Sequence, residues 1–408
     1  METDGMAGLR VLAIASDKAF LREVRVVLPL SALEQSGAVA GFRILDPVTG
    51  ALSGREGLEA FDALLVQREA PMRVVQFLSR AGLPFVYDLD DLLISSASYR
   101  RDSPDAGLRE FVVQACSLCH RLTVPHRRLL TSLEVRLGLA LDHKAVIAAN
   151  LCPLAEPVSR PPAPPSCLVW TTSDLPALTV SKPGVVQAVR QFSRARNLPV
   201  RLIGDFEPAI VQALPGAVVM GRMDYWRHKL FLLNLPPSIG VAPLETGADP
   251  RTQEFVDCKS DVKMVEYGGF GHAGVYSRAA PHVDTDLTAG LLADNTTEAW
   301  LEALDAAAEA EPGRWAEESR AIVRARNAET AAPSGWGKAL AEARLDGPIR
   351  LSHILEGLGF KHHHPGDALD GYPPHHRLAD LIYHGAYQRI VPRRWRSRIG
   401  RLFANLCF

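Results

Sequence analysis

The sequence predicts an α/β protein with two doubly wound domains facing each other across a cleft, followed by a helical and basic C-terminal tail. Two observations lead to this fold class. Short runs rich in Val, Ile, Leu or Phe alternate with helical patterns along most of the 408 residues, as buried parallel strands and their crossover helices do. A stretch with five prolines, Pro157–Ser166, separates these runs into two sets and is expected to be a stiff linker.

The expected elements follow in chain order. Strands are predicted in the first half at residues 9–16, 41–47, 61–69, 84–93, 121–126 and 144–150, and in the second half at 167–173, 199–205, 217–222, 238–245, 273–278 and 291–295. The Ala- and Glu-rich region Glu298–Arg344 is predicted to be helical. The predicted divisions are a first domain (8–156), a linker (157–166), a second domain (167–330) and a helical crossover with a tail (331–408). Ligands of such domains bind at the carboxyl ends of the strands, so we expect the site in the cleft.

The composition is that of a globular protein with a large core. The chain is 47% hydrophobic and has a net charge of −1, which gives no reason to expect a nucleic acid as partner. The N-terminus lacks the apolar region of a signal peptide, and no run of about 18 apolar residues predicts a transmembrane helix. Six cysteines do not form a disulfide framework in a chain of this length, so we expect a cytoplasmic protein.

Cys116–His120 matches the C-x-x-C-H pattern of c-type haem attachment. That chemistry normally requires export, for which the sequence shows no signal. The surrounding residues read as an apolar helix that runs into a short strand, and we favour this interpretation.

Gly269, Gly271 and Gly274 have the spacing of a dinucleotide-binding fingerprint. A true fingerprint follows a strand and opens a helix, because the phosphates sit at the N-terminus of that helix. Here a helical pattern comes first and a strand pattern follows. These glycines are therefore predicted to end a helix and turn into a strand.

The helix predicted before these glycines carries Lys259, Lys263 and Glu266, at spacings that place them on one face. Asp257 is its candidate N-cap. A helix N-terminus with two lysines attracts an anion, and a carboxylate accepts hydrogen bonds from a vicinal diol. The diphosphate and ribose of a nucleotide-sugar present both groups. A solvated Lys/Lys/Glu face with an ordinary ion pair explains the same spacing and stays open.

Six segments carry a resemblance to a known family. They are "VYDLDDLL" (Val86–Leu93), "LTVPHRRL" (Leu122–Leu129), "GVAPLETG" (Gly240–Gly247), "CKSDVKMVEYGGFG" (Cys258–Gly271), "GVYSR" (Gly274–Arg278) and "LLADNTTEAWLEAL" (Leu291–Leu304). From about Gly8 to Arg344 the chain resembles the retaining, two-domain glycosyltransferases of the GT-B fold, of the group-1 or family-4-like class, and within it enzymes of bacterial surface-polysaccharide assembly. The resemblance implies two Rossmann-like domains, the first on the acceptor side and the second for the nucleotide-sugar.

The resemblance also implies the donor-binding residues. The family has two acidic residues eight apart, the second of which binds the ribose, and Glu266 matches that second acid. Cys258 stands in the place of the first acid, so the retaining mechanism and any role for a first acid stay open. The other implied donor residues are Lys259 and Lys263 at the diphosphate, Thr172 and Ser173 near the phosphates, and Gly221, Arg222 and Met223 around the base.

In the first half of the chain, three acidic residues follow the apolar run that ends at Tyr87. Asp88 and Asp90 point the same way in a strand, and their D-x-D spacing is also that of single-domain glycosyltransferases that hold Mg²⁺ or Mn²⁺. We instead predict that Asp88, Asp90 and Asp91 act on the acceptor side, as a base or by orienting a hydroxyl. A turn with a helix cap remains an alternative. No metal and no cofactor are expected.

The predicted function is transfer of a sugar from a nucleotide-sugar to a saccharide, lipid-linked or protein acceptor. Two alternatives stay open: a non-catalytic nucleotide-sugar or glycan-binding scaffold, and a nucleotide-sugar epimerase. Between Arg377 and Arg401 the tail has seven arginines and one acid, Asp380. Such a basic stretch predicts peripheral contact with the anionic inner face of a membrane, although a solvated helix packed on the domain fits as well.

Overall fold

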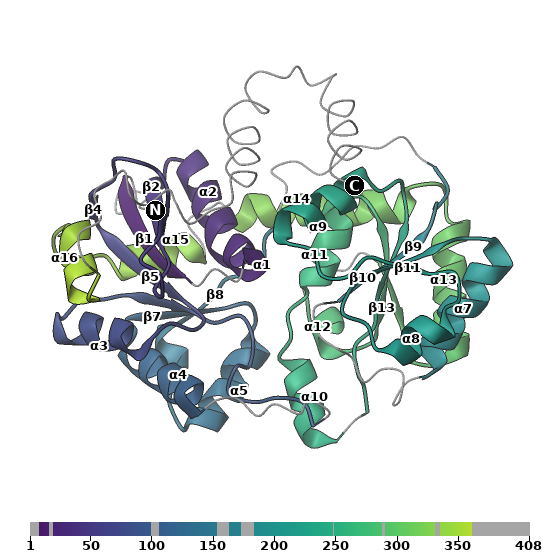
Figure 1. The fold of residues 1–408 in the computed structure, drawn as a ribbon, viewed down its shortest axis with the longest axis horizontal. Helices are drawn as coiled ribbons and strands as arrows, with labels where there is room; N and C mark the ends of the chain where they lie inside the picture. Colours follow the sequence, from purple (N-terminus) through teal and green to yellow (C-terminus); the bar gives the residue numbers. More distant parts are fainter. Residues whose placement is uncertain are drawn as a thin grey trace, which may run out of the picture.

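The computed structural model describes residues 8–15, 19–98, 106–152, 163–172, 183–247, 249–287, 290–330 and 335–360. They form two lobes that lie side by side, each built on a mostly parallel sheet flanked by helices (Figure 1). The predicted α/β class with two doubly wound domains is confirmed. The arginine-rich tail, Ser173 and most of the proline-rich linker lie outside the described residues.

The sheet of the first domain has the strand order β3-β2-β1-β5-β6-β7-β8. Neighbouring strands are parallel except β3, which runs antiparallel to β2. The strands are β1 (Leu9–Ala15), β2 (Val39–Leu45), β3 (Leu52–Gly54), β5 (Ala63–Gln67), β6 (Val86–Asp88), β7 (Arg121–Val124) and β8 (Ala145–Ile147). The helices are α1 (Ala19–Arg22), the π-helical turn η1 (Glu23–Val27), α2 (Leu28–Gln35), α3 (Met72–Arg80), α4 (Ala106–Leu118), α5 (Arg127–Leu137) and the 3₁₀ turn η2 (Asp142–Lys144).

The sheet of the second domain is parallel, with the order β11-β10-β9-β12-β13-β14. Its strands are β9 (Leu168–Thr172), β10 (Val200–Gly204), β11 (Val218–Val219), β12 (Ile239–Ala242), β13 (Ala273–Ser277) and β14 (Leu291–Ala293). Its helices are α7 (Pro183–Arg196), α8 (Pro208–Ala213), α9 (Tyr225–Asn234), α10 (Pro250–Asp257), α11 (Val262–Gly269), α12 (Ala280–Val283), α13 (Thr297–Glu309) and α14 (Arg314–Thr330).

The chain then returns to the first domain. Helix α15 (Trp336–Glu342) packs on the first sheet, and its Trp336 is fully buried there. Strand β15 (Ile349–Arg350) pairs antiparallel with β4 (Ala60–Phe61), and α16 (Leu351–Gly357) follows. The first domain is thus completed by residues from both ends of the described chain. Within the described part of the chain, no helix has the length and apolar character needed to cross a membrane.

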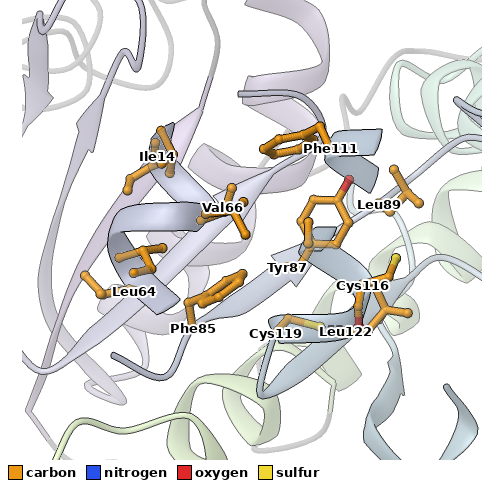
Figure 2. Close-up of a cluster of buried hydrophobic side chains, with 14 of the residues drawn as sticks. Ile14, Leu64, Val66, Phe85, Tyr87, Leu89, Phe111, Cys116, Cys119 and Leu122 are labelled. Atoms are coloured by element: carbon orange, nitrogen blue, oxygen red, sulfur yellow. Dashed lines mark hydrogen bonds between the residues drawn. The ribbon is translucent and has the colours of Figure 1, made fainter. Parts of the chain in front are cut away.

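Both faces of the first sheet are buried, which explains why its strands read as continuous apolar runs. Successive residues of β5 alternate between two core clusters, with Leu64 and Val66 in the one drawn in Figure 2. Cys116 and Cys119, at the end of α4, lie in the same cluster. Burial raises the pKa of both thiols, to about 11 for Cys119. The two cysteines are core residues of a helix that leads into β7.

Candidate active site

Each sheet has one point where the order of its strands reverses, and we call these the switch points. In the first sheet the switch point lies between β1 and β5, and in the second sheet between β9 and β12. In doubly wound domains, the crevice at the carboxyl ends of these two strands is where ligands bind. The loops that leave these strand ends therefore define the two halves of the candidate site.

The second switch point is formed mainly by backbone groups and by glycine residues. Thr172 ends β9, and Gly204 ends the neighbouring β10 with a φ of 112°. The Gly204 amide donates to the carbonyl of Gly221 at 2.7 Å. A Cβ on Gly204 would lie 1.7 Å from the Thr172 carbonyl oxygen, so only glycine allows this close approach. Two sequence-predicted donor residues, Thr172 and Gly221, are therefore brought to the same edge of the sheet.

Helix α11 is fixed against the two strands of this switch point by Tyr267. The Tyr267 hydroxyl contacts the carbonyls of Val169 in β9 and Val241 in β12, each at 3.3 Å, and the Thr171 hydroxyl at 3.2 Å. A Cβ on Gly240 would lie 2.3 Å from the Tyr267 ring, so β12 needs glycine here. These contacts fix the position of α11, and thus of its side chains, relative to β9 and β12.

Glu266 of α11 is a buried carboxylate with two basic partners. It is 1% exposed, its Oε2 lies 2.7 Å from Lys263 Nζ, and its Oε1 lies 3.4 Å from Nε2 of His228 in α9. Burial on its own raises the pKa of Glu266, but the charges of Lys263 and His228, with their hydrogen bonds, outweigh it and lower the pKa to about 2. The ion pair expected from the spacing is present, with a buried carboxylate and a partly exposed lysine.

The prediction of one helix carrying both lysines and Glu266 is wrong. Asp257 is the last residue of α10, and α11 begins only at Val262, so Lys259 lies in the turn between the two helices. The chain breaks there because Cys258 is buried in the core of the first domain, which anchors the turn away from the second sheet. Asp257 therefore caps no helix that carries Lys259.

The Lys259 turn is where the two domains meet. Lys259 Nζ lies 3.9 Å from Asp91 Oδ2, and the Lys259 carbonyl lies 2.9 Å from His126 Nε2 at the N-terminus of α5. His126 Nδ1 in turn accepts from the Leu129 amide and caps α5. Lys259, which is predicted for the donor side, and Asp91, which is predicted for the acceptor side, are thus adjacent although they are far apart in the sequence.

Helix α10 forms the rest of this contact, beside α5 at the lower edge of the two lobes (Figure 1). Glu254 pairs with Arg136 of α5, and Arg251 donates to the Ser96 carbonyl at 2.8 Å. The Ser98 amide donates to Thr252 Oγ1 at 2.9 Å. The two strand-end edges are therefore held face to face by α10.

The three acids of the first domain occupy different environments. Asp88 is 0% exposed and accepts from Arg25 Nη2 at 2.6 Å, Arg25 Nε at 3.2 Å and Thr123 Oγ1 at 2.8 Å. Burial raises the pKa of Asp88, and the bidentate contact with Arg25 acts against it. Asp90 is buried and pairs with Arg68 at 2.6 Å. Asp91, with a side chain 27% exposed, is the one of the three that reaches the domain contact.

Arg68 was not among the predicted site residues. It follows β5 at the first switch point, and its φ of 54° is rare for a residue with a side chain. Its carbonyl accepts from the Tyr87 hydroxyl at 2.7 Å, which holds this conformation. A charged residue directly after a buried strand, in "LLVQRE", is the sequence signal that could have indicated it.

Arg222 and Met223 follow Gly221 at the end of β11. Arg222 is exposed and pairs with Asp205 at 2.5 Å, whereas Met223 packs on the core beside α11. Cys258, at the place of the first acid, has a pKa raised to about 12, chiefly by burial. Among the described residues, no three His, Cys, Asp or Glu side chains come together as a metal site would require.

No family model and no curated protein matches the chain. Solved structures do match, and three of them are TarM (9% identity, 70% of this chain, 60% of TarM, TM-score 0.43), the pneumococcal O-GlcNAc transferase GtfA in complex with UDP and GlcNAc (12%, 69%, 57%, 0.46), and Anabaena HepE in complex with UDP and glucose (12%, 86%, 99%, 0.49). The chain thus spans about 60% of the length of TarM and GtfA. The two-domain architecture itself rests on the sheet topology of this chain.

Proposed function

We propose that the protein is a glycosyltransferase that moves a sugar from a nucleotide-sugar, bound by the second domain, to a hydroxyl acceptor bound by the first. The observation that carries this proposal is the contact of Lys259 with Asp91, at 3.9 Å. It brings the strand-end loops of two doubly wound sheets together, so two ligands bound at the two switch points would face each other.

The donor half has the chemistry that a nucleotide diphosphate requires. Lys263, next to the N-terminus of α11, and Lys259 in the preceding turn provide positive charge for the diphosphate. Each oxygen of the ionised Glu266 can accept more than one hydrogen bond, so a ribose hydroxyl can be bound while Lys263 is held. Lysines that stabilise the departing diphosphate would lower the barrier to sugar transfer.

The acceptor half supplies Asp91 as the group next to the incoming hydroxyl. Asp88 and Asp90 are already paired with Arg25 and Arg68, so their role in this proposal is to fix the loop that carries Asp91. Both pairs also leave the D-x-D carboxylates without spare charge for a divalent cation. These two ion pairs lead us to propose transfer without a metal. From the family resemblance we also propose retention of the anomeric configuration and a role in the assembly of a surface glycan.

Cys258 favours a second candidate, a nucleotide-sugar-binding protein without transfer activity. The family pattern has an acid at this position, and here a buried thiol packs against the first domain instead. The two candidates share the donor site and differ only in whether an acceptor releases the nucleotide.

The experiment has two stages. Thermal shift with UDP-, GDP-, dTDP- and CDP-sugars identifies the donor, because a bound ligand stabilises the folded state by mass action. Release of the nucleoside diphosphate is then measured with and without a panel of saccharide acceptors. We expect release that depends on the acceptor and is lost in Lys263→Ala but kept in Lys338→Ala, an exposed lysine of α15.

Donor binding without acceptor-dependent release from any acceptor would support the binding protein. Release of a free, isomerised sugar nucleotide without an acceptor would support the epimerase. A chain that none of the four classes of nucleotide-sugar stabilises would contradict the donor site itself.

A further inference from the structure

A continuous chain of buried polar side chains connects the two domains. It starts in the first domain at Thr123 and Asp88, passes through Arg25 to Asn150, and ends in the second domain at Asp261. Arg25 Nη1 donates to Asn150 Oδ1 at 3.2 Å, and Asn150 Nδ2 donates to Asp261 Oδ1 at 3.4 Å. Asn150 is 2% exposed and is thus shielded from water between its two partners.

Asp261 connects this series of hydrogen-bonded side chains to helix α11. Its Oδ2 accepts from Thr285 Oγ1 at 2.6 Å and lies 2.8 Å from Arg326 Nη2, while its backbone carbonyl accepts from the amides of Met264 and Val265. Burial on its own raises the pKa of Asp261, but the charge and hydrogen bond of Arg326 in α14 outweigh it and lower the pKa. A displacement of Asp261 would therefore displace the first turn of α11.

Arg25 anchors the other end in the first domain. Its guanidinium is held by Asp88, by the Ala148 carbonyl at 2.6 Å, and by the Trp336 ring at 4.8 Å. The π-helical turn η1 directs this side chain inward, and π-helical turns occur frequently at functional sites. Arg25 therefore has little freedom to move relative to the first sheet.

Asn150 differs from the other members of this hydrogen-bonded series because it is not needed to neutralise a buried charge. The charges of Arg25 and Asp88 neutralise each other, and Asp261 is paired with Arg326, which also pairs with the exposed Asp286. A neutral amide that accepts from one ion pair and donates to the other adds a defined geometry between the domains. Buried polar groups of this kind can specify one arrangement among several of similar stability.

We propose that Asn150 is a positioning residue that sets this arrangement of the two domains, in which Asp261 is linked through Asn150 to Arg25 and Lys259 lies 3.9 Å from Asp91. Its consequence for sugar transfer rests on the proposed function. The arrangement itself is a property of the free protein, so it can be tested whether or not the protein transfers a sugar.

The sharpest test reverses the hydrogen bond and then restores it. Asn150→Asp keeps the shape and the acceptor for Arg25 but turns the donor into a carboxylate that repels Asp261. The double variant Asn150→Asp/Asp261→Asn exchanges amide and carboxylate and recreates the donor–acceptor pair, while Arg326 keeps Asp286 as its charged partner. The readout is hydrogen exchange of the Ser98 amide, which donates across the domains to Thr252, in the full chain without ligand.

We expect Asn150→Asp to speed this exchange by about tenfold, equivalent to about 1.4 kcal/mol, and the double variant to return close to the original rate. Asn150→Ala, which removes both bonds without adding charge, should lie between them. Asn234→Asp makes the same chemical change on the exposed side of α9, where Asn234 donates to the Leu230 carbonyl, and should leave the rate unchanged. With a donor and acceptor identified, Asn150→Asp should lower kcat more than it raises KM for the donor.

Exchange at the original rate in a folded Asn150→Asp, or a double variant that exchanges as fast as the single one, would overturn the proposal. If Asn150→Asp does not fold, the decision passes to Asn150→Ala and the double variant. Absence of transferase activity would contradict the proposed function, while the exchange rates would still decide the role of Asn150.

Discussion

The two switch points are stabilised by different kinds of interaction. The first is built from charged side chains that the chain itself neutralises, with Arg68 on Asp90 and Arg25 on Asp88. The second is built from backbone and glycine, with Gly204 and Gly240 allowing close approaches that a Cβ would prevent. The first edge is therefore complete without a ligand, whereas the second carries Lys259 and Lys263, whose side chains are 22% and 26% exposed and suit an anionic ligand.

This difference predicts that the first edge is most sensitive to loss of a charged partner, whereas the second is most sensitive to side chains that would fill its close approaches. A buried ion pair is a weak source of stability as a whole, but the loss of one partner leaves an uncompensated charge in the core. The second edge holds its charge at Glu266, whose partner Lys263 keeps part of its side chain in water.

The largest effect is expected for Asp88→Ala. It leaves the fully buried Arg25 without its carboxylate, so the free energy of unfolding should fall by about 3–5 kcal/mol. Urea unfolding measures this loss. The control is Asp305→Ala, which breaks a solvent-exposed pair with Arg196 and should change the free energy of unfolding far less. Equal effects of the two substitutions would contradict the special role of the first switch point.

In the second domain the acid-sensitive group is His282. Its ring is buried and Nδ1 donates to the Ser277 carbonyl at 2.9 Å, and burial lowers its pKa from the ordinary 6.5 to about 4. The unfolded state then binds the proton first, so acidification from pH 6.5 to 4 should remove about 3 kcal/mol of stability through this residue. Unfolding of His282→Gln at both pH values measures its share. A variant as acid-sensitive as the original protein would contradict this assignment.

Glu266→Gln tests the donor side of the comparison. The substitution removes the carboxylate charge but keeps the shape, and loss of a charge-assisted hydrogen bond to the ribose should weaken nucleotide binding by about 1.5–3 kcal/mol. Because the pKa of Glu266 is depressed from 4.5 to about 2, its charge should be present at every pH above 4.5 and be lost only as the pH falls towards 2. Titration of the nucleotide into both proteins by calorimetry gives the difference. Equal nucleotide affinity of the original protein and the folded variant would contradict the assignment of Glu266 to the nucleotide site.

The smallest effect is expected for a chelator. If Arg25 and Arg68 already neutralise Asp88 and Asp90, transfer should persist after dialysis against EDTA. Loss of activity that Mn²⁺ restores would instead indicate that the D-x-D acids bind a metal, and would move the donor to the first domain.

The sequence predicted the architecture better than the site. Strands such as β5 and β13 read clearly because both faces of each sheet are buried and, apart from Gln67 at the end of β5, every residue is apolar or small. The two-residue pairing of β15 with β4 joins distant parts of the chain and leaves no local pattern. The split between α10 and α11 was missed because it depends on Cys258 packing into the other domain, which is a tertiary effect.

The site shows the same limit at the level of single residues. Lys263 and Glu266 could be paired from their spacing, since neighbours on one helix follow from its period. Asp88 could be found but not interpreted, because its partner Arg25 lies 63 positions earlier in the chain. Arg25 stands alone in the apolar stretch "VRVVLPL", and an isolated charge in such a stretch was the available signal of a buried partner.

The most direct measurement of the central claim is hydrogen exchange across the chain with and without the nucleoside diphosphate that gives the largest thermal shift. Our account predicts protection in the loop after β12, residues 243–247, and from Lys259 through α11, with no change after β5 and β6 in residues 68–69 and 89–92. Protection confined to the loops of the first domain would contradict it, because the nucleotide would then bind at the switch point that already neutralises its own charges.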